Sequence, residues 1–340
     1  MRISHSGKST LMQCGRKYEL HYIEKLRSPK LFSSLFFGSA LDNAFSRLLL
    51  DKKQVLSAEE VLQLDSSADE IFYNSMLKVE NNGEVVEVSK SSFADYYSSD
   101  YTPELLTSAS FALIAEFAPD VVDPLAFMED CKAVIKGKKK LSAEDLPLFN
   151  YITWLSLVEK GYLMLQAYRD QIMPEIFEVY SIQEAISIKN ESGDEISGLI
   201  DFTCSFVSDP GTMYVCDNKT SSKPYKPEET GTSAQLSTYC EFKQTNKAAY
   251  VVIEKKLYAK GPKIRTQILR AEISEATFAD TFAGFEDALY SISTGEFEKN
   301  LKSCFDYGRM CPFFSICKHN NYAGVVNLNT CSSPLEKALK

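Results

Sequence analysis

The sequence lacks the features of a membrane protein, a secreted protein or a protein coated in basic surface. Its 340 residues contain no run of eighteen apolar side chains, and MRISHSGKST at the start lacks the apolar stretch of a signal peptide. The net charge is −9, although an acidic protein can still carry a local basic groove. We therefore expect a soluble, cytoplasmic protein that has no membrane partner.

Histidine is also scarce, and a phosphate-binding loop is incomplete. The three histidines show no metal-ligand spacing and are expected to be surface groups: His5, His21 and His319. The stretch SHSGKST resembles the end of a Walker A loop, but Arg2 stands where that motif needs its first glycine, and no strand is predicted before it. One of its serines is expected to cap a helix instead. The sequence therefore predicts no ATPase motor.

Cysteine, by contrast, is plentiful and partly clustered. Nine cysteines in a reducing compartment favour metal ligands or reactive thiols over disulfides. Cys304, Cys311 and Cys317 are separated by six and five residues, so their thiols could surround a tetrahedral centre that needs a fourth ligand. The remaining cysteines are expected to be small buried side chains, except for the last one, which lies in a polar tail: Cys131, Cys204, Cys216, Cys240 and Cys331.

Hydrophobic periodicity divides the chain into a helical first half and a second half rich in strands. Helices are predicted over residues 8–26 and from Gly38 to Leu50, with further helical patterns up to residue 170. Strands are then predicted over 175–190, 195–207, 212–220, 248–258 and 263–273, with helices over 228–246 and 275–297. We expect an α/β fold in which helices flank a mixed sheet and a large helical insertion interrupts the chain.

This pattern suggests four regions. They are N-terminal helices (1–50), a helical insertion (51–172), a core (173–300) and a C-terminal cysteine region with its tail (301–340). No internal repeat or low-complexity linker is evident.

Two acidic residues and a lysine lie on consecutive predicted strands. Asp201 falls in the middle of one strand, and Asp217 and Lys219 fall at the end of the next. The Ser-Asp-Pro-Gly-Thr turn makes these strands a hairpin, so the two aspartates can approach each other. Asp217 and Lys219 are two residues apart and therefore point to the same face. Two carboxylates that hold Mg²⁺ or Mn²⁺, with a lysine beside them, suit phosphodiester hydrolysis; alone, the pattern also fits a solvated strand end.

A further pair lies sixteen residues after Lys219. Gln235 and Tyr239 are one helical turn apart and share a face. The order G-x-x-D, D-x-K, Q-x-x-x-Y resembles the RecB-like branch of the PD-(D/E)XK nucleases. The resemblance implies a restriction-endonuclease-like fold, metal binding by Asp201 and Asp217, catalysis by Lys219, and support of the site or DNA contact by Gln235 and Tyr239.

Three more residues belong to the implied metal site. Asn218 lies inside the D-x-K motif, and Glu184 matches an acidic position of many members, although an exposed strand carboxylate is an equal alternative. Members usually have a histidine in a helical G-x-x-x-H segment, where this chain has Gly38 followed by Asp42. Aspartate is a hard oxygen ligand that suits Mg²⁺, so the exchange is compatible with an intact site, an altered metal preference or a weakened enzyme.

The cysteines extend the resemblance. Nucleases of the AddB type and the exonucleases of CRISPR adaptation have one cysteine before the nuclease motifs and three after them, and these bind a [4Fe–4S] cluster. The resemblance assigns that role to Cys14, Cys304, Cys311 and Cys317, although six residues replace the commoner two in the first spacing and zinc remains an alternative. Such a cluster would join the first helix to the tail. The tail pattern CxxYGRxCPxxxxC resembles bacteriophage-encoded members.

The sequence thus predicts a metal-dependent deoxyribonuclease, an exonuclease favouring single-stranded ends, whose partner is single-stranded DNA or duplex ends. Its expected setting is recombination, replication or repair, with proteins of those processes as further partners. If the protein is phage-encoded, that setting is the host cytoplasm. The alternative is a DNA-binding or assembly protein that keeps the nuclease fold and has lost activity.

Overall fold

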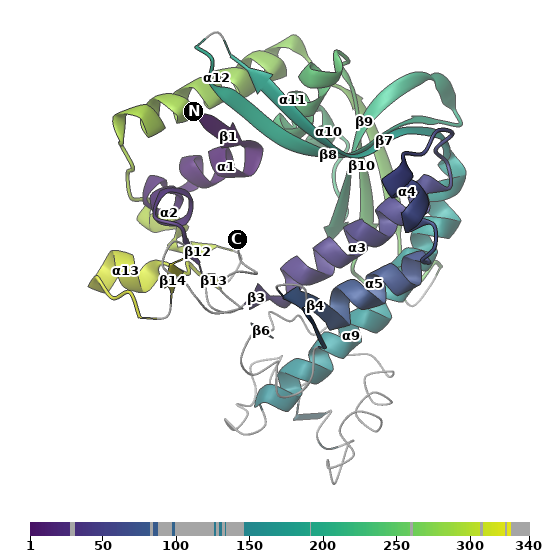
Figure 1. Ribbon diagram of the computed structural model, residues 1–340, viewed down its shortest axis with the longest axis horizontal. Helices are drawn as coiled ribbons and strands as arrows, with labels where there is room; N and C mark the ends of the chain where they lie inside the picture. The colour runs from purple at the N-terminus through teal and green to yellow at the C-terminus, as the bar shows by residue number, and fades with distance from the viewer. Residues whose placement is uncertain are drawn as a thin grey trace.

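The computed structural model is built around a six-stranded mixed sheet, drawn in the upper part of Figure 1. The structure describes residues 1–27, 31–81, 84–87, 97–98, 126, 129–130, 133, 146–190, 192–258, 261–306, 309–323 and 325–327. The strands are β1 (Arg2–Ser4), β7 (Ile176–Lys189), β8 (Glu195–Phe206), β9 (Asp209–Ser221), β10 (Lys247–Glu254) and β11 (Thr266–Glu272). Their order is β1-β8-β9-β10-β11, and β7 also pairs with β8.

The sheet is mixed because its strands enter it by two kinds of connection. The hairpins β7–β8 and β8–β9 are antiparallel, as the turn residues between them predict. β10 lies parallel to β9 because the chain returns through helix α11 (Ala234–Lys243), and β11 is antiparallel to β10. From its second to its last residue β10 is buried, which explains its nearly continuous apolar sequence. The predicted strands of the core are confirmed.

Helices cover both faces of the sheet. On one face lie α3 (Ser33–Leu50), α5 (Ala68–Leu77) and α9 (Leu146–Ala167), which run side by side in Figure 1 and share a core with β8, β9 and β10. On the other face lie α11, the short α10 (Glu228–Gly231) and α12 (Glu275–Thr294), and α11 shares a second core with the sheet. Short helical turns span Tyr168–Ile172, Met173–Glu175 and Leu301–Cys304.

The N-terminal segment forms a broken helix preceded by a strand. α1 (His5–Gln13) begins after Ser4, whose side chain accepts a hydrogen bond from Gly7 N at 3.1 Å. α2 (Gly15–Tyr18) and a π-helical turn (Glu19–Ile23) follow. The break falls at Cys14, which is extended at φ −166° and ψ 113°. Capping by a serine is confirmed, whereas the expectation of no preceding strand is wrong, because β1 pairs with the start of β8.

The predicted helical insertion also contains strands. α4 (Ala58–Gln63), α5 and α9 agree with the prediction, but β4 (Lys78–Asn81) and β5 (Glu84–Glu87) form an antiparallel pair, and β3 (Leu31–Phe32) pairs with β6 (Tyr97–Ser98). The sequence Asn-Gly at positions 82–83 is a typical hairpin signal that would have predicted this pair. Cys131 and Cys331 lie outside the described residues.

The end of the N-terminal helical segment packs against the C-terminal part of the described chain. β14 (Val326–Asn327) pairs with β2 (Leu26–Arg27), and β12 (Phe305–Asp306) pairs with β13 (Arg309–Met310). Phe313, directly before α13 (Phe314–His319), and Ile316 within it pack against Leu20 and Leu26 of the N-terminal segment. Among the described residues, no helix has the length and apolar character needed to cross a membrane.

Candidate active site and cysteine site

Three aspartates from three elements place their charges close together. Asp201 lies in the middle of β8, Asp217 near the end of β9, and Asp42 in α3. Burial raises the pKa of Asp201 to about 8, and the charges of Asp217 and Asp42 add to the rise. Burial also raises the pKa of Asp42 and of Asp217. The region therefore concentrates more negative charge than burial favours, and it is stabilised by a proton or a cation.

Hydrogen bonds fix two of these carboxylates and leave one oxygen of Asp42 without a well-formed bond. The Asn218 backbone N–H donates to Asp201 Oδ2 at 2.8 Å, and Gln183 Nε2 donates to Asp42 Oδ2 at 2.8 Å. Asp42 Oδ1 is buried and makes no hydrogen bond of good geometry, although the Asn218 side chain, like that of Gln183, counteracts the rise that burial causes in the pKa of Asp42. Asp217 Oδ2 is buried against Lys219. Hard, partly unsatisfied oxygens are the donors that Mg²⁺ and Mn²⁺ prefer.

Lys219 joins the aspartates to helix α11. Its Nζ lies 2.6 Å from Asp217 Oδ2 as an ion pair and donates to Gln235 Oε1 at 3.0 Å. Burial alone would lower the pKa of Lys219, but the charge and hydrogen bond of Asp217 outweigh it, so the pKa is raised above its ordinary value. Lys219 therefore stays protonated at neutral pH. A protonated lysine stabilises developing negative charge and does not act as a general base.

The helix that carries Gln235 is fixed against the sheet. The Ser233 side chain caps α11 by accepting from Leu236 N, and Gln235 Nε2 donates to the Tyr239 hydroxyl at 3.1 Å. The Tyr239 ring lies directly on Gly198 of β8, where an added Cβ would come within 2.7 Å of Tyr239 Cε1. The glycine of the G-x-x-D motif therefore permits the close approach of α11 to the strand of Asp201.

Glu184, another predicted metal ligand, is paired with a lysine. Lys243 Nζ of α11 lies 2.7 Å from the Glu184 carboxylate. Burial acts to raise the pKa of Glu184, but its bonds to Lys243 and Ser181 prevail and lower it. The structure thus places Glu184 in an ion pair that joins β7 to α11.

Two residues near the site carry no sequence signal that would have identified them. Gln183 bonds to Asp42, as described above. His5, predicted as a surface group, is partly buried at the start of α1, and its Nδ1 has no hydrogen-bond partner. Burial lowers the pKa of His5 to about 4, and the charges of Lys8 and Lys219 contribute. That prediction is wrong because β1 pairs with β8, which brings His5 toward Lys219 from a distant part of the chain.

The other two histidines differ from each other. His21 is also partly buried, edge-on to Tyr22 and Phe313, and burial lowers its pKa to about 4, so the surface prediction is wrong there as well. His319 is exposed, as predicted.

The four cysteines of the predicted cluster lie in one neighbourhood. The thiols of Cys304 and Cys14 contribute to the raised pKa of Cys311. The thiols of Cys311 and Cys14 contribute in the same way to the raised pKa of Cys317. Burial is the largest cause of the raised pKa of Cys311 and of Cys317. The three cysteines outside this group that the structure describes are buried, as predicted: Cys204, Cys216 and Cys240.

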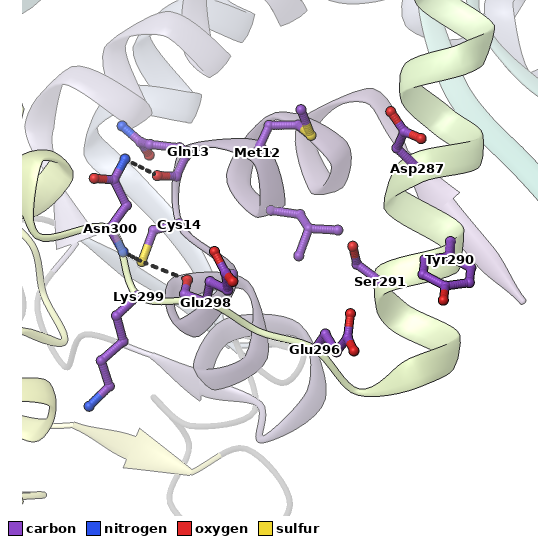
Figure 2. A pocket seen from close by; sticks show the side chains of 12 residues that line it. Met12, Gln13, Cys14, Asp287, Tyr290, Ser291, Glu296, Glu298, Lys299 and Asn300 are labelled. Carbon is purple, nitrogen blue, oxygen red and sulfur yellow. Dashed lines mark hydrogen bonds between the residues drawn. The ribbon is translucent and has the colours of Figure 1, made fainter.

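The segment after α12 passes beside Cys14, with Glu298 and Asn300 next to it (Figure 2). Asn300 donates from its backbone N to Cys14 Sγ at 3.4 Å and from Nδ2 to Gln13 O at 2.9 Å. Gly15 allows this contact, because an added Cβ would lie 2.6 Å from Glu298 N. A cavity of about 740 Å³ between α1 and α12 borders Cys14.

Neither the aspartates nor the cysteines form a finished metal-ligand shell. Within the described ranges, no group of three or more His, Cys, Asp or Glu side chains is arranged to hold a metal ion. The aspartates concentrate negative charge, and the cysteines bring four thiols into one neighbourhood. Both are reasons to test for metal.

The mixed sheet flanked by helices is the fold of an enzyme class that cleaves phosphodiester bonds. Residues 2–318 match the family model of the PD-(D/E)XK nuclease superfamily, so the chain belongs to this superfamily. Its restriction-endonuclease-like α/β fold, a mixed sheet flanked by helices, is as predicted. Nucleases of this superfamily generally use Mg²⁺ or Mn²⁺. A search of curated proteins found no significant match.

Proposed function

We propose that the protein is a Mg²⁺- or Mn²⁺-dependent deoxyribonuclease, an exonuclease that favours single-stranded ends and serves DNA recombination, replication or repair. One observation carries this proposal. Asp42, Asp201 and Asp217 concentrate negative charge beside Lys219, which an ion pair and a glutamine bond hold in place. This arrangement is unfavourable for an apoprotein and useful for an enzyme that binds divalent metal next to a phosphate.

Each side chain then has a distinct task. The three aspartates would hold the metal, which when bound polarises the phosphate and lowers the pKa of a water molecule. Lys219, protonated, stabilises the negative charge that develops on the phosphate during attack. Gln235 and Tyr239 fix the position of Lys219 through consecutive hydrogen bonds, and the Asn218 backbone fixes Asp201.

Cleavage assays with end-labelled DNA test the enzyme. Linear and circular single strands, and duplexes blocked at either end, are incubated with Mn²⁺ or Mg²⁺. We expect cleavage of linear single strands and resistance of circles. Lys219→Met should abolish cleavage, whereas Lys256→Met, at an exposed lysine just after the neighbouring strand β10, should not. DNA binding without cleavage by the wild type would favour the inactive DNA-binding protein, and cleaved circles would show endonuclease activity.

We further infer that Cys14, Cys304, Cys311 and Cys317 hold a [4Fe–4S] cluster. Support comes from their common neighbourhood and from the order of the motifs. Four thiolates suit such a cluster, and the binding free energy would add to folding stability by tying the N-terminal helices to residues 298–317.

Metal analysis of anaerobically purified protein tests this inference. We expect iron and sulfide with broad absorbance at roughly 400 nm, as thiolate-bound clusters show. Cys317→Ser should lose both the iron and much of the thermal stability, while Cys240→Ser, at a buried cysteine in α11, should keep the iron. Stoichiometric zinc without iron would refute the cluster and support a zinc site.

A further inference from the structure

Gln183 has an unusual backbone conformation in the middle of β7. Its φ of +49° is left-handed, and the three other described residues that share this feature without being glycine lie outside strands: Lys25, Gln244 and Asn320. In the antiparallel register, Ile182 faces Phe202 and Glu184 faces Ile200, so Gln183 lies opposite Asp201. A left-handed glutamine costs roughly 1 kcal/mol or more, and such strain persists where surrounding contacts fix it.

The contacts of Gln183 lead to the candidate active site. Its Nε2 donates to Asp42 Oδ2 at 2.8 Å and lies 3.3 Å from Ser46 Oγ, one turn further along α3. An amide nitrogen can only donate, so Oδ2 of Asp42 must accept. The other oxygen, Oδ1, is buried and makes no hydrogen bond of good geometry, although the Asn218 side chain lies close enough to counteract the rise that burial causes in the pKa of Asp42. Gln183 therefore holds Oδ2 of Asp42 and leaves Oδ1 as the oxygen without a well-formed bond.

We propose that Gln183 is a positioning residue that turns Asp42 Oδ1 toward Asp201 and Asp217, so that the helix α3 contributes an oxygen to the divalent-metal site. This inference rests on the proposed function, because it takes Asp42 as a metal ligand. The left-handed backbone explains how a side chain in a strand opposite Asp201 reaches back to a helix on the face of the sheet. Groups that orient a metal ligand typically change metal affinity 10- to 100-fold when they are removed.

The same contacts would also exist if Gln183 only attached α3 to the sheet. The two roles differ in their effect on metal affinity. A purely structural link would affect thermal stability and leave the intrinsic affinity of the folded protein for Mn²⁺ unchanged. A positioning residue would affect that affinity even when stability is preserved.

Gln183→Asn separates these roles. Asparagine tolerates a positive φ but is one methylene shorter, so the backbone is kept while the amide no longer reaches Asp42. Gln183→Gly keeps the backbone without any side chain and serves as the second variant. The matched control is Gln171→Asn, because Gln171 also joins two elements, through Ile264 O at 3.1 Å and Thr266 Oγ1 at 3.1 Å, in another part of the molecule.

Binding of Mn²⁺ is measured without DNA, by electron paramagnetic resonance titration and by the shift of the melting temperature. We expect both Gln183 variants to weaken Mn²⁺ binding about tenfold or more, while the control variant binds as the wild type does. Unchanged Mn²⁺ affinity in the Gln183 variants, with normal binding by the wild type, would overturn this inference alone. A wild type that binds no Mn²⁺ would overturn the proposed function together with it.

Discussion

Replacing Asp201 with asparagine should stabilise the metal-free protein while it abolishes cleavage. Asp201 lies among Asp217 and Asp42 in a largely buried place, and its ionised form is therefore unfavourable in the folded chain. Asparagine has nearly the same shape and stays neutral. Its side-chain oxygen can still accept the hydrogen bond from the Asn218 backbone N–H.

The size of the effect follows from the pKa. In the folded protein the pKa of Asp201 is about 8, against about 3.9 in an unfolded chain. The folded state thus binds the proton more tightly, so its stability is fully present below pH ~4 and falls as the pH rises toward 8. A difference of roughly four pH units sets a ceiling of roughly 5–6 kcal/mol. The three aspartates share their mutual repulsion, so removing one charge relieves only part of it. We therefore expect Asp201→Asn to raise the free energy of unfolding by about 2–4 kcal/mol at pH 8.5.

Thermal and urea unfolding at pH 5 and pH 8.5, in buffer free of divalent metal, measure this gain. Asp201→Asn should be more stable than the wild type at pH 8.5, with a much smaller difference at pH 5. Added Mg²⁺ should stabilise the wild type more than the variant. Asp280→Asn, an exposed aspartate in α12, should behave as the wild type. A variant that is no more stable than the wild type at pH 8.5 would refute the reasoning.

Four further substitutions test other parts of the structure. Lys219→Met should lower the cleavage rate at least ~100-fold with little change in DNA affinity by fluorescence anisotropy; a similar loss of affinity would instead indicate a binding role. Gly198→Ala should force Tyr239 away and cost about 1–3 kcal/mol in urea unfolding, more than the ~1 kcal/mol expected when Tyr239→Phe removes one hydrogen bond. Gly161→Ala in α9 should destabilise by a similar 1–3 kcal/mol or so, because its Cβ would lie 1.8 Å from Phe72 Cζ; a gain from helix propensity would show that Phe72 moves aside.

The sequence predicts the core of the fold well because local patterns determine it. β7, β8 and β9 have turn residues between apolar runs, and β10 is apolar on both faces. These signals are read within a few residues of each other. β1 and β14 are different, because strands of two or three residues carry no periodic pattern and form only when a distant partner is present.

The candidate site, too, could be predicted from the sequence only in part. The spacing of Asp217 and Lys219 puts both on one face, and the ion pair between them agrees with that. The positions of Gln183 and His5 could not be predicted, because one depends on a left-handed residue inside a strand and the other on the pairing of β1 with β8. The grouping of Cys14 with the C-terminal cysteines needed the family resemblance, since no spacing rule connects residues almost three hundred positions apart.

Helix α1 has a consequence for how cysteine variants are interpreted. It begins at His5, whose pKa responds to Lys219, and ends at Gln13, directly before Cys14. Nine residues of α-helix span about 14 Å, so one rigid segment separates the thiol that would bind iron from the lysine that would face the phosphate. Releasing Cys14 would loosen the far end of the same segment. Lower nuclease activity in a cysteine variant would therefore reflect a displaced helix α1. A role in electron transfer would have to be shown separately, by a change in activity with redox potential in protein that retains all its iron.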